Sequence, residues 1–97
     1  MKIKVISKRT FQMDKKKKLI PLLTKLRSLS KQQPGHLYRE TLRSIDNPGE
    51  YIVISEWKKI EYWKQWLRNK EIKDIQGQID SLIGEKTIYE VFEPEIF

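Results

Sequence analysis

Residues 50–57 have the sequence EYIVISEW, with four apolar residues in a row near the start of the segment. β-Branched and aromatic side chains of this kind are typical of β-strands. Because successive side chains of a strand point to opposite faces, one face carries Tyr51, Val53 and Trp57. The other face carries Ile52 and Ile54. The segment therefore predicts a strand that is apolar on both faces, whereas a strand covered on one side alternates apolar and polar residues.

Three further strands are predicted around this one. The residues before it, 46–49, are DNPG, a turn signal that joins the strand in a hairpin to an extended segment over 36–45. A first strand is predicted over 2–11, where branched apolar residues alternate with lysines. A last strand is predicted over 86–93, and Pro94 ends it.

Helical periodicity predicts three helical segments, over residues 15–33, 59–69 and 70–83. We expect Asp14 to be the N-cap of the first helix and Pro34-Gly35 to end it. Pro21 lies inside this helix and removes one backbone donor, so a kink or a weak first turn is expected there. Gly84 is expected to cap the last helix at its C-terminus.

The order of these elements is β-α-β-β-α-β, which predicts an α+β, ferredoxin-like fold over a single domain, residues 1–97. Its four-stranded antiparallel sheet would carry the helices on one face. The last strand repeats the two-sided pattern, with Ile88 and Phe92 opposite Tyr89 and Val91. Helices on one face leave the other apolar face uncovered, so we expect a homodimer that packs sheet against sheet.

Composition excludes several classes of protein. The chain has no cysteine and a single histidine, His36, so disulfides, thiolate metal sites and two-histidine catalytic pairs are excluded within one subunit. No metal site is therefore expected. No apolar run approaches the roughly 20 residues of a membrane span, and no signal peptide is visible. We expect a cytoplasmic protein without a membrane partner.

The net charge of +7 is unevenly distributed along the chain. Residues 1–33 hold eleven Lys or Arg and one acid, a net charge of +10, whereas residues 34–97 have a net charge of −3. The run of lysines over 15–18 is expected to be a solvated helix turn. Strand 50–57 lacks the glycine-containing aromatic signature of RNA-recognition domains, so no nucleic-acid partner is expected.

The segment YIVISEWKKIEYWKQWL, residues 51–67, resembles the antibiotic biosynthesis monooxygenase-like domains, and residues 33–35 and 41–51 support the resemblance. The resemblance covers nearly the whole chain. It implies the fold and homodimer of the dimeric α+β barrel proteins. It also implies activities of that family, which include cofactor-independent oxygenation of phenols and quinols and the degradation of haem.

The family's functional positions are only partly matched. Members that resemble quinol oxygenases often carry His where this chain has Trp66. The haem-degrading branch carries Trp there, but its haem-ligating His corresponds to Gln76, and its strand-one Asn falls near Ser7. Haem degradation is therefore less favoured, and no cofactor is expected.

The resemblance favours a cofactor-independent monooxygenase that acts on a small phenolic or quinol-like molecule in a pocket between sheet and helices. The expected substrate-binding residues are Trp66, Trp57, Tyr38 and Arg39; no catalytic residue is assigned. Arg39 could bind a carboxylate or pair with a strand acid such as Glu56. A non-catalytic, ligand-binding or accessory dimer of the same fold remains the alternative function.

The sequence generates one prediction about haem. Because Gln76 replaces the ligating histidine, titration with hemin is expected to give only a weak and poorly defined change in the absorption spectrum. A sharp Soret band at one-to-one stoichiometry would contradict this prediction. Loss of that band in His36→Ala would then identify the ligand that the prediction overlooks.

Overall fold

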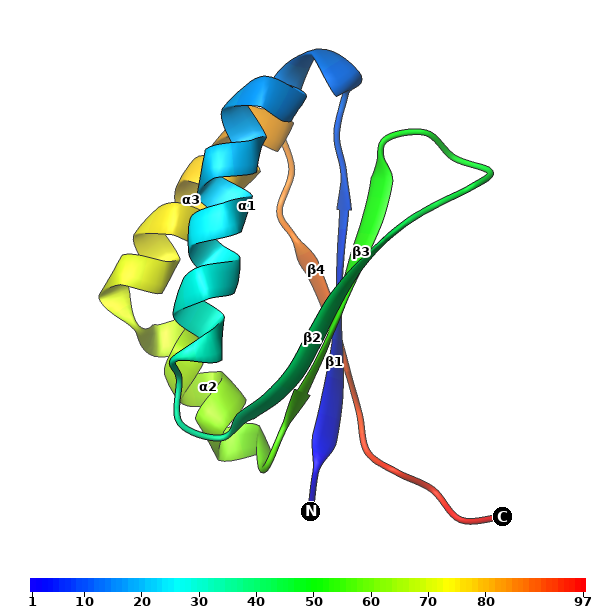
Figure 1. Cartoon of the computed structure of the whole chain (residues 1–97), viewed down its shortest axis with the longest axis vertical. Coiled ribbons are helices and arrows are strands. Elements are labelled where there is room, and N and C mark those ends of the chain that lie inside the picture. Colours follow the sequence, from blue (N-terminus) through cyan, green and yellow to red (C-terminus); the bar gives the residue numbers. More distant parts are fainter.

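In the computed structural model, which describes residues 1–97, strands and helices alternate largely as the sequence patterns predict (Figure 1). The elements are β1 (Ile3–Thr10), the 3₁₀ turn η1 (Met13–Lys15), α1 (Lys16–Lys31), β2 (His36–Arg43), β3 (Glu50–Trp57), α2 (Ile60–Arg68), α3 (Lys70–Ile83) and β4 (Ile88–Phe92). None of the helices has the length and apolar character that crossing a membrane requires.

The four strands form one sheet in the order β2-β3-β1-β4, and all neighbours are antiparallel. The three helices lie on one face of this sheet (Figure 1). The predicted α+β, ferredoxin-like architecture is thus confirmed. Strands β1 and β3 occupy the centre of the sheet, and their pairing places Arg9 opposite Tyr51 and Ser7 opposite Val53.

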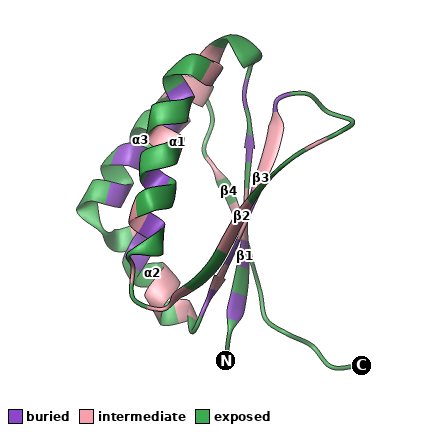
Figure 2. Ribbon diagram, viewed as in Figure 1, coloured by how far each residue is buried: buried purple, intermediate pink, exposed green.

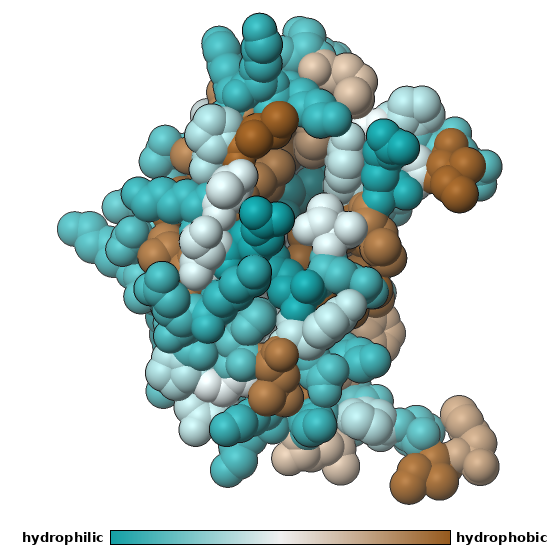
Figure 3. Space-filling model, viewed as in Figure 1, coloured by the Kyte–Doolittle hydropathy of each residue, from teal (hydrophilic) through white to brown (hydrophobic).

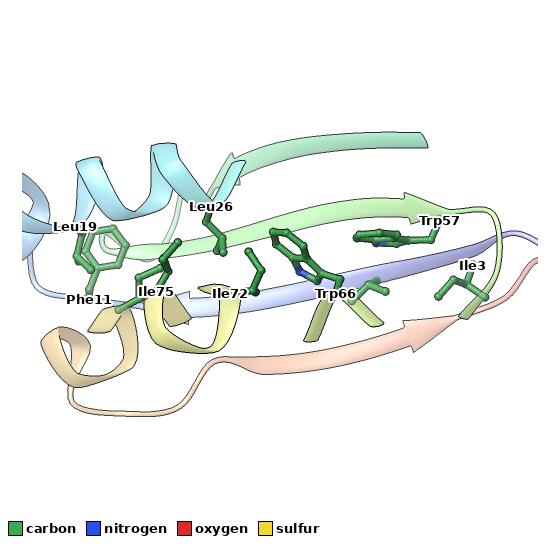
Figure 4. Close-up of a cluster of buried hydrophobic side chains, with 10 residues drawn as sticks. Ile3, Phe11, Leu19, Leu26, Trp57, Trp66, Ile72 and Ile75 are labelled. Atoms are coloured by element: carbon green, nitrogen blue, oxygen red, sulfur yellow. The ribbon is translucent and has the colours of Figure 1, made fainter. Parts of the chain in front are cut away.

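The core lies between the helices and the sheet, where Figure 2 shows the buried residues. Ten buried apolar residues form one cluster: Ile3, Val5, Phe11, Leu19, Leu26, Trp57, Trp66, Ile72, Ile75 and Ile79. Figure 4 shows Phe11 and Leu19 at one end of this cluster and Trp57 and Ile3 at the other. Trp66 lies beside Trp57, with ring centroids 6.1 Å apart.

Gly49 fixes the β2–β3 hairpin against the end of β1. Its φ of 88° is in the left-handed region, which glycine adopts without strain. A Cβ at this position would overlap the backbone oxygen of Phe11, and the Phe11 amide donates a hydrogen bond to the Gly49 carbonyl at 2.9 Å. This close approach requires glycine and determines where Phe11 lies.

The expected capping of the helices is partly wrong. Asp14 does not cap α1, because residues 13–15 form a 3₁₀ turn that leads directly into the helix and is closed by a bond from the Lys15 amide to the Gln12 carbonyl. Gly84 does end α3, with φ 87°. The side chain of Asn69 accepts hydrogen bonds from the backbone amides of Glu71 and Ile72 and thereby separates α2 from α3.

His36 follows a turn but is half-buried rather than exposed. Its ring lies edge-on to Trp57, with centroids 5.2 Å apart. The reason is a register shift in the β2–β3 pairing. His36 pairs with Trp57, and Tyr38, two residues further along β2, pairs with Glu56, which is only one residue away from Trp57. Such a bulge turns one side chain out of the regular alternation, and here it brings the imidazole onto the inner face.

The uncovered face of the sheet carries an apolar surface, as the two-sided patterns predict. We call this surface the outer face; its apolar residues are Ile6, Tyr38, Leu42, Ile52, Ile54, Ile88 and Phe92. Four of these side chains are strongly exposed, with Ile88 reaching 59%. Hydrophobic atoms are visible among hydrophilic ones along this side of the molecule in Figure 3.

The position of Trp66 in the core gives a stability prediction. This side chain is 6% exposed, so Trp66→Ala is expected to lower the free energy of unfolding by about 3–5 kcal/mol. Trp66→Phe should cost less because it leaves a smaller void. Urea unfolding followed by circular dichroism measures both. An unfolding free energy of Trp66→Ala equal to that of the unaltered chain would contradict the core assignment.

Candidate functional site

A cavity of about 180 Å³ lies between helix α1 and the inner face of the sheet. Its helical wall is formed by Lys16, Leu19, Ile20, Leu23, Thr24 and Arg27. Its sheet wall is formed by Arg9, Phe11, Arg39, Thr41, Tyr51 and Val53. The cavity thus has a largely apolar middle, and the positively charged side chains Lys16 and Arg27 stand at the two ends of the helical wall.

The spacing of α1 explains its wall. The lining positions recur every three or four residues, so they form one stripe along the helix. Lys16 and Arg27 are eleven residues apart, which corresponds to about 16 Å along the helix axis. The leucine periodicity predicts this stripe as a core face. Side chains of the sheet, however, fill only part of the space opposite it.

Aromatic rings form the hairpin end of the cavity. Phe11 and Tyr51 are stacked, with ring centroids 4.7 Å apart and planes that differ by 1°. The hydroxyl oxygen of Tyr51 is buried and has no hydrogen-bond partner. A buried hydroxyl of this kind is costly unless something binds it, so Tyr51 carries an unused hydrogen-bonding group at this end of the cavity.

Arg9 is held rigidly beside the cavity. It is 6% exposed, and its guanidinium donates hydrogen bonds to Thr87 Oγ1 at 3.1 Å and Gln76 Oε1 at 2.9 Å. The Tyr89 hydroxyl donates to the same Gln76 oxygen at 3.1 Å. Burial lowers the pKa of Arg9, and the charge of Asp80 acts in the opposite direction. Gln76 thus links a polar network between α3, β1 and β4.

Arg39 lies at the other end of the cavity from Tyr51 and has few partners. Its only hydrogen bond is a long one, 3.4 Å, from Nη1 to Ser30 Oγ, and its buried Nε has none. Burial, followed by the positive charges of Arg9 and Arg27, lowers the pKa of Arg39 to about 10. The guanidinium therefore remains a cation at neutral pH.

No acidic residue lines the cavity beside its cations. The twelve lining residues include three arginines and one lysine but no Asp, Glu or His. The ion pairs of the chain lie elsewhere and join Lys2 to Glu56, Lys8 to Glu50 and Lys25 to Glu71. Arg39 therefore does not form the expected pair with Glu56. No group of His and acidic residues capable of holding a metal ion is present.

The structure separates the four expected substrate-binding residues. Arg39 lines the cavity. Trp57 lies at the opposite end of the core from Phe11 and Leu19, and Trp66 lies between Ile72 and Trp57 (Figure 4); neither tryptophan lines the cavity. Tyr38 lies on the outer face, where its hydroxyl donates to Glu40 Oε2 at 2.9 Å. Substrate binding by these three aromatic residues stays a prediction.

Sequence reasoning missed most of the cationic lining, namely Arg9, Arg27 and Lys16. A signal for Arg9 was present, because it shares the odd-numbered, inward face of the first strand with Ile3 and Val5. Arg27 also follows the leucine stripe of α1, although its side chain is exposed. Charged residues on a face that alternation assigns to the core are candidates for a buried site.

Solved structures share this architecture over nearly their whole length. A conserved protein from Methanosarcina mazei Go1 is 18% identical, with a TM-score of 0.89 and coverage of 98% of this chain and 94% of that one. SnoaB, a cofactor-independent oxygenase from Streptomyces nogalater, is 12% identical, with a TM-score of 0.80 and coverage of 99% and 95%. At these identities the likeness establishes the fold alone.

Rv0793 from Mycobacterium tuberculosis is similar in the same sense, at 15% identity, a TM-score of 0.86 and coverage of 100% of this chain and 98% of that one. No curated protein matches the chain. A family model does match, and its description is antibiotic biosynthesis monooxygenase; the match spans residues 2–78. That span contains all twelve residues that line the cavity and both central strands. The chain therefore belongs to the antibiotic biosynthesis monooxygenase family.

Proposed function

We propose that the chain is a cofactor-independent monooxygenase that oxidises a small phenolic or quinol-like molecule in the cavity between α1 and the sheet. The observation that carries this proposal is the cavity itself, which combines apolar and aromatic walls with a buried, unpartnered hydroxyl of Tyr51. The family to which the chain belongs, and the structural likeness to the cofactor-independent oxygenase SnoaB, support the same class of reaction.

The size of the cavity favours a substrate with one aromatic ring. A dry, apolar cavity of about 150 Å³ accommodates benzene, and the cavity here measures about 180 Å³. A single ring with one or two small substituents fits this space. The four-pyrrole macrocycle of haem is much larger than this cavity, so the cavity volume favours a single-ring phenol over haem as the substrate.

In the proposed reaction the substrate enters as, or becomes, a phenolate. The phenolate gives one electron to O₂, and the resulting superoxide and phenoxyl radical combine at a ring carbon that bears hydrogen, ortho or para to the oxygen. The hydroperoxide then loses water and leaves a carbonyl, so that phenol plus O₂ gives quinone plus water. The substrate is the reductant, and one oxygen atom enters the product.

The chain's own residues assist this chemistry by stabilising negative charge. The cavity lining offers no carboxylate or imidazole to act as a general base. A nearby positive charge instead lowers the pKa of a bound phenol, and Lys16 stands at the same end of the cavity as Tyr51. The free Tyr51 hydroxyl then donates to the phenolate oxygen, between walls that are largely apolar.

We also propose that two copies of the chain pack sheet against sheet through the outer face. The apolar side chains of this face are partly exposed in one copy. Burying a few hundred square ångströms of apolar area per subunit contributes several kcal/mol, at about 25 cal/mol per Å², before the cost of association. A second copy is the simplest partner, because its outer face offers the same surface.

Oxygenation is tested by oxygen consumption with a panel of single-ring phenols and quinols, using ¹⁸O₂ and mass spectrometry of the product. We expect one ¹⁸O atom per product molecule. Tyr51→Phe removes the donor to the phenolate and is expected to lower turnover about 100-fold. Arg43→Gln serves as the control, because Arg43 pairs with Tyr51 across the strands but lies outside the cavity. Ligand binding without any oxygen consumption would contradict the enzyme and favour a binding protein.

The dimer is tested by sedimentation equilibrium at micromolar concentration. We expect a mass near twice the 11.7 kDa of one chain. Ile54→Asp places a charge in the centre of the outer face and should yield the monomer mass. Ile45→Asp is the matched control, because Ile45 is 96% exposed in the hairpin loop, and should leave the dimer intact. A monomer mass for the unaltered chain would overturn the proposal.

A further inference from the structure

The lining of the cavity carries four positively charged side chains and no acidic one. Arg9, Arg39, Arg27 and Lys16 contribute to its lining without any acid among the twelve residues. Burial lowers the pKa of Arg39, and the positive charges of Arg9 and Arg27 lower it further. Like charges that face a partly enclosed, apolar space repel one another more than they would in water. A bound anion would relieve this repulsion.

The hydrogen bonds distinguish the two arginines of the sheet wall as partners for that anion. Arg9 already donates to Thr87 and Gln76, so its position is explained by the polar network. Arg39 has only the long bond to Ser30, and its buried Nε donor is unused. A guanidinium with free donors in a fixed plane suits a carboxylate, which accepts two parallel hydrogen bonds.

The sheet register places the two free polar groups at opposite ends of the cavity. Arg43 pairs with Tyr51, Thr41 with Val53, and Arg39 with Ser55. Arg39 therefore lies four residues along the sheet from the position of Tyr51, about 13 Å between backbone positions. The space between them is lined by apolar side chains of β3 and α1.

We propose that the ligand of this cavity is an aromatic carboxylate, whose carboxylate binds Arg39 while its ring lies between Val53 and Leu23 and a hydroxyl reaches Tyr51. This inference rests on the proposed function, since it names the substrate class of the same site. A para-hydroxylated benzoate has this arrangement of groups, with its two polar ends on opposite sides of one ring. Arg27 adds positive charge at the carboxylate end.

The test compares 4-hydroxybenzoate with 4-hydroxybenzamide by isothermal titration calorimetry. The two ligands share ring and hydroxyl, so their difference isolates the negative charge. We expect the amide to bind on the order of 10- to 100-fold more weakly, as is typical for the loss of a charge-assisted hydrogen bond. Inorganic sulfate should bind more weakly than 4-hydroxybenzoate, because it has no ring. Equal binding of benzoate and amide, or tighter binding of sulfate, would overturn the proposal.

Variants assign the effect to Arg39. Arg39→Gln is expected to remove the preference for 4-hydroxybenzoate over the amide, whereas Arg43→Gln, which removes the same charge four residues along β2, should retain it. A thermal melt of the free protein checks folding. Because Arg39→Gln takes one cation out of a repelling cluster, its melting temperature should not fall below that of Arg43→Gln. A preference for benzoate that survives in folded Arg39→Gln would overturn the role of Arg39.

Failure of this proposal and failure of the proposed function give different results. If 4-hydroxybenzoate binds tightly and charge-dependently but no phenolic compound leads to oxygen consumption, the result supports an aromatic carboxylate as the ligand. The same result contradicts the proposed monooxygenase activity. If neutral phenols are oxygenated and the carboxylate is not preferred over the amide, the result supports the proposed monooxygenase activity. It contradicts the aromatic carboxylate as the substrate class. Binding and turnover are therefore measured with the same ligands.

Discussion

Strand β3 carries apolar side chains on both faces of the sheet, and the rest of the structure depends on this constraint. It pairs with β1 on one side and β2 on the other. Its inner face contributes Trp57 to the core, and Val53 and Tyr51 to the cavity wall. Its outer face presents isoleucines that the helices cannot reach. One apolar strand therefore supports the core, one wall of the cavity and the surface proposed for the dimer.

The core and the cavity share the same two layers but differ in how they are filled. Large side chains close the space at the end marked by Trp57 and Trp66, where the rings are in contact. Toward the hairpin, the stripe of α1 faces Thr41, Val53 and two arginines, and space remains. Gly49 holds Phe11 close to the hairpin, so the stack of Phe11 on Tyr51 closes that end. A charged, partly open site is thereby separated from a dry core.

Periodicity predicted the order of elements, the single helical face of the sheet and its two-sided strands, because alternation and helical spacing depend on local sequence. Three features were not apparent from these patterns. A 3₁₀ turn leads into α1 where Asp14 was expected to cap the helix. A bulge in β2 turns the side chain of His36 toward the inner face of the sheet. The cavity is built across β1, β2, β3 and α1, so Arg39 was identified as a binding residue while its neighbours Arg9 and Arg27 were not. Spacing alone also could not separate a core position for Trp66 from a pocket position.

The central claim is that the ligand binds between α1 and the sheet at Arg39, and not at the tryptophan end of the core. The most direct measurement is a ¹H–¹⁵N correlation spectrum during titration with 4-hydroxybenzoate, in which side-chain Nε–H groups of arginine and indole N–H groups are observed together. The account predicts a large shift of the Arg39 Nε–H signal and of the Tyr51 amide, with the Trp66 indole unchanged. A shifted Trp66 indole with an unchanged Arg39 signal would contradict it.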